Sequence, residues 1–136
     1  MTAIGTITVT PQDGNGTWLV ELAGEHDIST APLVEQQTSR VWPACTLAVV
    51  DLSEATFIDC SVLNWLVRTR STLAETTGGQ ALRIFWGPPG SLGERIYKLV
   101  WLRDELPFYP TRADALARTS AAPKTDRAVV PGGATW

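Results

Sequence analysis

The chain has 136 residues, 44% of them hydrophobic and 18% charged, which is the composition of one globular domain rather than of a disordered chain. Its formal net charge is −3 and it has no basic cluster, which argues against nucleic acid as a partner. No apolar run approaches the roughly 18 residues of a membrane span and no signal peptide is visible, so we expect a cytoplasmic protein without a span. A chain of this length can fold without a metal or a disulfide, and we expect neither a cofactor nor a metal site.

The first two predicted elements are strands joined by a turn. Ile4–Thr10 alternates between apolar residues and threonine, as a half-buried strand does, and Trp18–Ala23 is a second strand-like run. Between them, the Asp-Gly and Asn-Gly steps of Pro11–Gly16 indicate a turn, so we predict a hairpin.

A polar segment, Gly24–Asp27, ends the second strand. Because side chains alternate along a strand, Glu25 and Asp27 should share one face while His26 points the other way. From the residues alone, this segment is either a solvated strand end or part of a site. His26 is the one histidine of the chain, and we expect it to be structural or solvated rather than catalytic.

The next predicted element is a helix. Ser29 or Thr30 can cap its N-terminus, Pro32 is tolerated in its first turn, and Pro43 should end it. The residues expected on its apolar side are Leu33, Val34, Gln37 and Val41.

The chain is organised around the stretch Leu47–Leu66. It opens with a run rich in β-branched residues, Leu47–Val50, which is typical of a buried strand. It then turns through Asp51–Thr56 to a second apolar pair, Phe57-Ile58, after which the apolar spacing becomes helical. We therefore predict a strand, a short turn and a helix.

Asp59 lies where the N-cap of that helix belongs, because its carboxylate can accept hydrogen bonds from the free amides of the first turn. Cys60 and Ser61 then fall in the first turn, at the end of the helix that favours anions. Trp65 falls off the apolar stripe and is expected at the surface, where it could anchor an interface. The helix should run to about Thr76, and the residues expected near its buried side are Leu63, Leu66, Val67, Arg70, Leu73 and Ala74.

After this helix, Gly78-Gly79 should end it and Ala81–Trp86 should form a strand. Ser91 can cap a helix over Leu92–Trp101. Leu106–Tyr109 fits a short edge strand, because its proline limits the hydrogen bonds it can make. A last helix is predicted over Thr111–Thr119, capped by Thr111, with Ala113 and Leu116 facing inward.

Strands alternate with helices after the initial hairpin. This order predicts an α/β fold with a mixed sheet of four to five strands and helices packed mainly on one face. We expect residues 1–119 to form a single domain, and the Pro-, Gly-, Ala- and charge-rich residues 120–136 to be a disordered tail.

The two cysteines do not form a disulfide framework. Cys45 precedes the central strand and Cys60 follows it, so a strand alone would separate them by about 20 Å. A disulfide needs Cα atoms within about 7 Å of each other. An internal bridge is therefore not expected, although a bridge between two molecules remains open if either thiol is exposed.

The central stretch resembles the phospho-acceptor segment of STAS domains, the family of bacterial anti-sigma factor antagonists. The family pattern is a strand ending in Asp-Leu-Ser, then Phe-Ile/Met-Asp-Ser-Ser/Thr-Gly-Leu opening a helix. The corresponding residues here are Asp51-Leu52-Ser53 and Phe57-Ile58-Asp59-Cys60-Ser61-Val62-Leu63. Further segments resemble the pattern in the right order, namely Gly24–Asp27, Thr30–Leu33, Gly78–Ile84 and Arg95–Leu106. The resemblance covers roughly residues 5–118 and implies a STAS-like domain.

The resemblance implies a regulatory binding protein rather than an enzyme. In the family, the serine after the Phe-Ile-Asp aspartate is phosphorylated by an anti-sigma factor of the serine kinase type, and the phosphate releases that partner. Here the acceptor position is Cys60, and a thiol is not a substrate of ordinary serine kinase chemistry. Ser61 is a possible shifted acceptor, although one helical residue turns its side chain by about 100°. Val62 replaces the family's glycine.

The first hypothesis is therefore an anti-sigma factor antagonist that lacks the usual acceptor and is constitutively competent to bind. The partner is an anti-sigma factor of the serine kinase type, and the resemblance places Asp27 close to Asp59. The residues that we expect to bind the partner are Glu25, Asp27, Asp59, Cys60, Ser61, Asn64 and Trp65.

Two further hypotheses rest on Cys60. A thiol at a helix N-terminus can gain thiolate character, so an oxidised or glutathionylated Cys60 could act as a redox switch. The alternative to this redox switch is an inert, buried cysteine that replaces serine at equal size. The other hypothesis is a thiol enzyme in which His26 is the base for Cys60 and Asp27 or Asp59 orients it. The sequence leaves the oligomeric state open.

Overall fold

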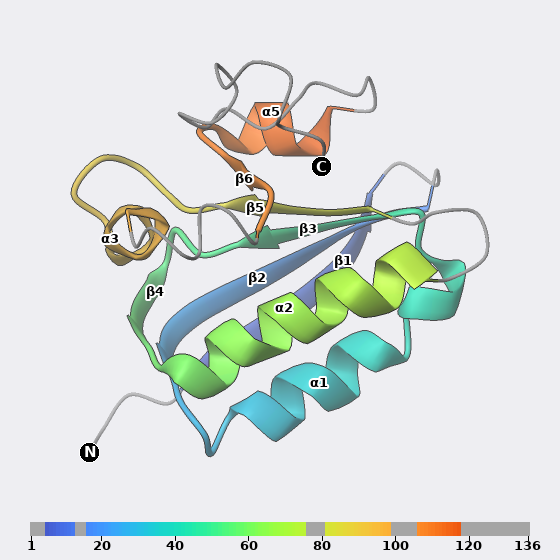
Figure 1. Cartoon of the computed structure of the whole chain (residues 1–136), viewed down its shortest axis with the longest axis horizontal. Coiled ribbons are helices and arrows are strands. Elements are labelled where there is room, and N and C mark those ends of the chain that lie inside the picture. The colour runs from blue at the N-terminus through green and yellow to red at the C-terminus, as the bar shows by residue number, and fades with distance from the viewer. Residues whose placement is uncertain (1–4, 13–15, 76–80, 99–105, 118–136) are drawn as a thin grey trace, which may run out of the picture.

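The computed structural model describes residues 5–12, 16–75, 81–98 and 106–117 (Figure 1). In chain order the elements are β1 (Thr6–Gln12), β2 (Thr17–His26), α1 (Ala31–Ser39), the short 3-10 helix η1 (Trp42–Ala44), β3 (Leu47–Asp51), β4 (Ala55–Ile58), α2 (Cys60–Glu75), β5 (Ala81–Phe85), α3 (Leu92–Tyr97), β6 (Phe108–Tyr109) and α5 (Arg112–Leu116).

The strands form a mixed sheet in the order β1-β2-β3-β5-β6. β1 and β2 are the predicted antiparallel hairpin, and the other pairs are parallel. Every residue of the central strand β3 is buried, as its apolar run predicts, and β6 lies at the sheet edge, also as predicted. The α/β fold with a mixed sheet is confirmed.

The described residues contain six strands, more than the four to five that we predicted. The additional strand is Ala55–Ile58, where we predicted a turn and an apolar pair. β4 pairs in parallel with the second half of β2, beyond the part of β2 that pairs with β3. The register shifts between Gly24 and Glu25, and Gly24 has a φ of 81°, which suits glycine. This irregularity lets β2 change partners and extends it to His26.

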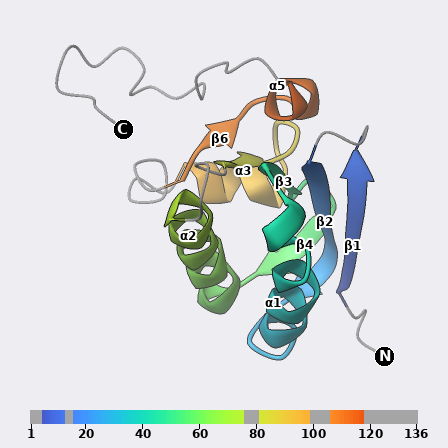
Figure 2. The same cartoon turned by 90° about the vertical axis from the view of Figure 1, so that its right-hand side faces the viewer.

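Among the described helices, α1 and α2 cover one face of the sheet, as predicted, and α5 lies on the other (Figure 2). The larger core cluster includes Val20, Leu22, Val50 and Leu66, on the side of α1 and α2. A smaller cluster on the α5 side joins Leu19, Leu47, Val49, Tyr109 and Ala115.

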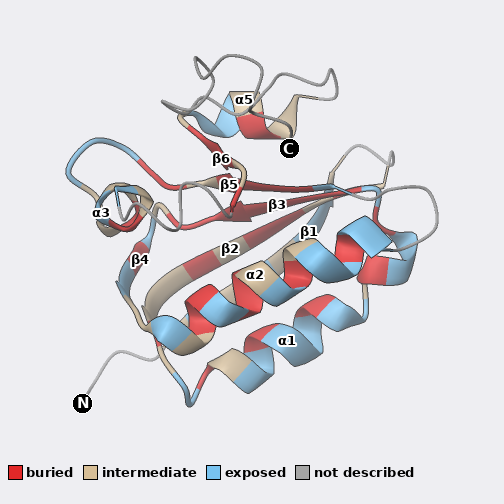
Figure 3. Ribbon diagram, in the orientation of Figure 1, coloured by how far each residue is buried: buried red, intermediate tan, exposed pale blue. Residues whose placement is uncertain are grey.

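The expected exposure of Trp65 is wrong, since only 2% of it is exposed. α2 contacts both α1 and the sheet strand β5, so its buried surface is wider than the single stripe assumed from the sequence (Figure 3). Ala74 was expected inward but is exposed, and Arg70 is half-buried. The buried residues of α2 are Val62, Leu63, Trp65, Leu66, Thr69 and Leu73.

Two other inward faces also differ from the prediction. On α1, Val34 and Thr38 are buried while Leu33 and Gln37 are exposed, because this outer helix meets the core along a narrow line. On α5, Ala115 is buried instead of Ala113.

Two predicted helix caps are confirmed: Ser91 accepts a hydrogen bond from the Glu94 amide, and Thr111 accepts one from the Asp114 amide. The predictions for Gly78-Gly79, for the helix beyond Lys98 and for the tail lie outside the described residues. None of the described helices is long and apolar enough to cross a membrane.

Candidate functional site

Asp59 joins the start of α2 to the loop between β2 and α1. Its Oδ1 accepts a hydrogen bond from the Ser61 amide at 2.9 Å, which confirms the predicted N-cap. Its Oδ2 accepts a hydrogen bond from the Ile28 amide at 3.2 Å, across 31 positions of sequence. One carboxylate therefore connects the loop between β2 and α1 to the start of α2. The family resemblance had implied that these two segments lie close together.

Asp27 makes the same type of turn at the start of α1. Its Oδ1 accepts hydrogen bonds from the Ser29 amide at 2.8 Å and from the Ser29 hydroxyl at 2.5 Å. The Ser29 hydroxyl, followed by the Ser29 and Thr30 amides, holds the pKa of Asp27 below its ordinary value, because these donors favour the ionised carboxylate. Asp27 is thus a fixed negative charge beside the Asp59 cap.

His26 is fully buried and structural, as expected. Its Nε2 lies 3.2 Å from the Thr6 carbonyl oxygen and 3.0 Å from that of Ala23, so Nε2 must carry a proton to donate. Its Nδ1 lies 3.2 Å from Thr30 Oγ1. Both ring nitrogens are engaged away from the exposed Cys60, so the geometry does not supply the base of the Cys60–His26 thiol enzyme.

Cys60 is an exposed free thiol at the first position of α2, so the expectation that a cysteine replacing serine here would be buried is wrong. Cys45 is also free but buried, and burial raises its pKa to about 11. The expectation that the two do not pair is therefore confirmed. Ser61 is half-buried and its hydroxyl donates to Asp59 Oδ1 at 2.5 Å, while Asn64 is exposed one turn further along α2.

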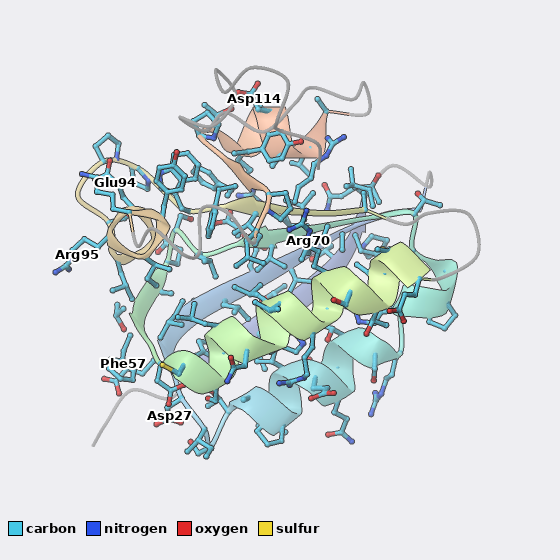
Figure 4. The ribbon with its side chains drawn as sticks, in the orientation of Figure 1. Asp27, Phe57, Arg70, Glu94, Arg95 and Asp114 are labelled. Carbon is cyan, nitrogen blue, oxygen red and sulfur yellow. The ribbon has the colours of Figure 1, made fainter. Side chains whose placement is uncertain are left out.

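Large apolar side chains are exposed in the segments next to this acidic cap. Among the described residues, the exposed ones are Ile28 at 75%, Leu33 at 48% and Phe57 at 48%. Ile28 lies in the loop that Asp59 holds, Leu33 in the first turn of α1, and Phe57 two residues before Asp59. Figure 4 shows Phe57 and Asp27 beside the start of α2, at the end of the molecule where α1 also begins.

We call this region the Cys60 surface, which consists of Asp27, Ile28, Leu33, Phe57, Asp59 and Cys60. Glu25 pairs with Phe57 in the β2–β4 register, so it flanks this surface. Trp65 does not belong to it, because its side chain is buried. Sequence reasoning missed the apolar members, because it placed Leu33 on the apolar side of its helix and gave Phe57 only as part of an apolar pair. The isolated Ile28 between polar neighbours was the one available signal.

The Cys60 surface combines exposed apolar side chains, two carboxylates and a thiol. The described residues contain no group of three His, Cys, Asp or Glu placed to hold a metal. They do present exposed apolar residues in the segments that carry Asp27, Asp59 and Cys60, and backbone amides of these segments donate hydrogen bonds to both carboxylates. Exposed apolar clusters of this kind mark interaction sites more often than isolated apolar residues do.

Comparisons with known proteins agree with this fold. The family described as the STAS domain matches residues 7–115. The anti-sigma-F factor antagonist RsfB of Mycobacterium tuberculosis is 31% identical over 117 residues, which span 85% of this chain and 92% of that protein.

Solved structures agree as well. An anti-sigma factor antagonist from Mycobacterium paratuberculosis is 25% identical, with a TM-score of 0.64, over 85% of this chain and 96% of that one. The unphosphorylated form of the anti-sigma factor antagonist SpoIIAA is 14% identical, with a TM-score of 0.63, over 81% of this chain and 92% of that one, a likeness of fold alone. From the matched segment, the relatives and the shared fold, this chain belongs to the STAS domain family.

Proposed function

We propose that this protein is an anti-sigma factor antagonist that binds an anti-sigma factor of the serine kinase type through the Cys60 surface. By holding that partner, it frees a sigma factor and so regulates transcription. The names of the RsfB relative and of the Mycobacterium paratuberculosis structure support the class of function. The kinase type of the partner and the residues that bind it are our own inference.

One observation carries this proposal: the exposed large apolar residues of the described part of the chain, Ile28, Leu33 and Phe57, all belong to segments at the end of the molecule where α1 and α2 begin. An aliphatic or aromatic side chain that inserts into a partner's pocket commonly supplies most of an interface's binding energy. Asp59 holds Ile28 in place through its amide, so the loop is already ordered before binding. Glu25, Asp27, Ser61 and Asn64 would contribute polar contacts at the rim.

Cys60 leaves the proposed switch without its usual acceptor hydroxyl. We propose that the unmodified protein is competent to bind at all times unless another group of the surface is modified. Ser61 is the shifted acceptor that the sequence suggests, but its hydroxyl is half-buried and donates to the Asp59 cap. Its phosphorylation would first require that cap to open.

A redox-responsive STAS module is the second candidate function, and the exposure of Cys60 favours it. An oxidised or glutathionylated Cys60 would place a polar or bulky group in the middle of the Cys60 surface. In this candidate, hydrogen peroxide weakens partner binding by the wild type and leaves binding by Cys60→Ala unchanged. Equal weakening of both proteins would reject it.

The main proposal is tested by binding. The full chain is used to capture the anti-sigma factor from its own cells, the captured protein is identified by mass spectrometry, and the purified pair is titrated. Ile28→Asp should weaken binding about 30-fold, the loss of an interface hot spot of about 2 kcal/mol. Because Ile28 is 75% exposed, this variant should keep its fold.

Asp59→Lys should also weaken binding, and its matched control is Glu75→Lys, the same charge change on an exposed residue at the other end of α2. If binding is unchanged in Ile28→Asp and Asp59→Lys, or if Glu75→Lys weakens it equally, the partner does not bind at the Cys60 surface. A captured partner that is not an anti-sigma factor would reject the function itself.

A further inference from the structure

We propose that this protein forms a homodimer in which the β1 strands of two copies pair in antiparallel fashion and join their sheets. β1 lies at one end of the strand order and pairs with β2 along all seven of its residues. Within the part of the chain that the structure describes, no strand pairs with its other side (Figure 2). An unpaired strand edge presents free amides and carbonyls, to which another strand can bind. The inference involves no residue of the Cys60 surface and does not depend on the proposed function.

The two end strands of this sheet differ in how far they are protected. β6 has two residues and lies between Pro107 and Pro110, so it offers little backbone for pairing. β1 pairs with β2 residue by residue from Thr6 to Gln12, which makes it a long and regular edge. Its segment Thr6–Thr10 has no charged side chain and no proline, the features that commonly prevent pairing at an edge. A second strand can therefore add at β1 but not at β6.

A hydrogen bond of β2 shows which of its backbone groups face β1. The Gly24 amide donates to the Glu54 carbonyl at 3.0 Å, on the side where β4 lies. Because the amide and the carbonyl of one trans peptide point in opposite directions, the Ala23 carbonyl faces β1. Its partner in the register is Thr6, so the backbone groups of Thr6 face β2 in return.

The free edge of β1 is self-complementary. Backbone direction alternates along a strand, so the threonines of Thr6–Thr10 face β2, and the amides and carbonyls of Ile7 and Val9 point to the free edge. When two copies pair about a two-fold axis at Thr8, Ile7 of each copy lies opposite Val9 of the other. Each of these two pairs exchanges two hydrogen bonds, and Thr8 faces its own counterpart. Thr-Ile-Thr-Val-Thr is nearly palindromic, so every side chain meets one of its own kind.

The side chains of β1 suit this pairing. Ile7 and Val9 are half-buried against the larger core cluster, and the threonines between them are exposed on the opposite face. Pairing would cover the two aliphatic side chains further and place threonines opposite threonines, a favourable cross-strand combination. It would desolvate no charged side chain of Thr6–Thr10.

The size of the contact sets the expected strength and the number of copies. Thr6–Thr10 is much shorter than the roughly 20–30 residues that each partner contributes to a stable interface, so we expect a reversible dimer with a Kd on the order of 10–100 µM. Each copy has one open edge, which the partner's β1 occupies. The assembly should therefore stop at two copies.

The dimer is tested by sedimentation velocity of the full chain in a reducing buffer, which prevents disulfides through the exposed Cys60. From about 5 to 500 µM, the average mass should rise from that of a monomer toward that of a dimer. Thr8→Lys should raise the Kd at least about tenfold, because two like charges then meet at the axis. Thr72→Lys, the same change at an exposed threonine of α2, should dimerise like the wild type. A monomer at every concentration, a species larger than a dimer, or an unchanged dimer in Thr8→Lys would overturn the inference.

A second measurement tests the register without adding a charge. In a Cys60→Ala background, Thr8→Cys should form a disulfide-linked dimer on mild oxidation with copper phenanthroline. A directly opposed pair that exchanges no hydrogen bonds has Cα atoms about 4.5 Å apart, which lies within the range of a disulfide. Thr72→Cys in the same background should stay largely monomeric, and equal cross-linking of the two variants would overturn the pairing at Thr8.

Discussion

Asp51 and Asp59 follow each other closely in the chain, yet the protein uses them in different ways. Asp51 ends β3, is only 3% exposed, and lies 3.6 Å from the guanidinium of Arg112 on α5. Asp59 follows β4, is half-buried, and accepts hydrogen bonds from backbone amides and the Ser61 hydroxyl. The first carboxylate is matched by a cation within the fold, and the second organises a surface that faces solvent.

The regions around these two residues differ in the same way. On the α5 side, Arg112 also pairs with Glu21 at 3.3 Å, and the mostly buried Arg83 donates to the backbone carbonyls of Ala115 and Ala117. Arg83 lies 5.3 Å from the centre of the Tyr109 ring. The charged groups there form ion pairs and hydrogen bonds that attach α5 to the sheet. At the Cys60 surface, apolar and acidic groups are instead exposed to solvent, where a partner can contact them. We therefore expect changes on the α5 side to affect stability and changes at the Cys60 surface to affect binding.

The largest expected effect separates the two sides of α2. Trp65→Ala should lower the free energy of unfolding by about 3–5 kcal/mol, because it leaves a cavity in the larger core cluster. Its control is Asn64→Ala, an exposed neighbour whose loss should change stability by less than about 0.5 kcal/mol. Chemical denaturation measures both. If the Trp65→Ala protein is as stable as the wild type, the burial of Trp65 in the core is contradicted.

The second prediction concerns the ion pairs that attach α5 to the sheet. Arg112→Met should lower the free energy of unfolding by about 1–3 kcal/mol, since the buried Asp51 loses its cation and remains next to Glu21 on the neighbouring strand. Arg95→Met, an exposed arginine on α3, should be nearly neutral. Partner binding should be unchanged in both. Loss of binding in Arg112→Met with unchanged stability would contradict the division between the two regions.

The same division explains what the sequence could predict. The caps at Asp59, Ser91 and Thr111 depend on a few neighbouring residues, so composition and spacing were sufficient to place them. The strand β4 was missed because it depends on β2 changing partners at Gly24, a long-range pairing that β4 itself does not encode.

Side-chain burial was harder to predict, since it depends on which helices meet. Trp65 is buried because α2 packs on α1 as well as on the sheet, and Leu33 is exposed because α1 meets the core along a narrow line. The apolar part of the Cys60 surface was hidden for the same reason. Periodicity places apolar residues in a core by default, and only the tertiary arrangement shows Leu33 and Phe57 facing solvent.

The third prediction compares the two thiols. At neutral pH, Cys60 should react with a thiol reagent at least about tenfold faster than Cys45, which is buried as a neutral thiol. Because burial raises the Cys45 pKa from 9.0 to about 11, its contribution to stability is present below pH 9 and is lost as the pH rises toward 11. Cys45→Ala should remove this part of the alkaline destabilisation. Equal labelling of both cysteines in the folded protein would reject the comparison.

The smallest expected effect concerns Asp27. Its pKa is lowered mainly by the Ser29 hydroxyl, so Ser29→Ala should raise it toward the ordinary value of about 3.9. The rise should be partial, because the amides of Ser29 and Thr30 still favour the ionised form. A lowered pKa contributes stability that is present above the ordinary value and is lost as the pH falls through the folded value. Ser29→Ala should make this acid loss smaller.

The measurement is an NMR titration of the Asp27 carboxyl carbon in the wild type, Ser29→Ala and Ser61→Ala. Ser61 donates to Asp59 and not to Asp27 in this structure, so Ser61→Ala should leave the Asp27 titration unchanged. An Asp27 pKa that does not move in Ser29→Ala would mean that the hydroxyl is not held against the carboxylate in solution. That result would contradict the ordered turn from Asp27 to Ser29 at the edge of the Cys60 surface, because this turn depends on the contact between the hydroxyl and the carboxylate.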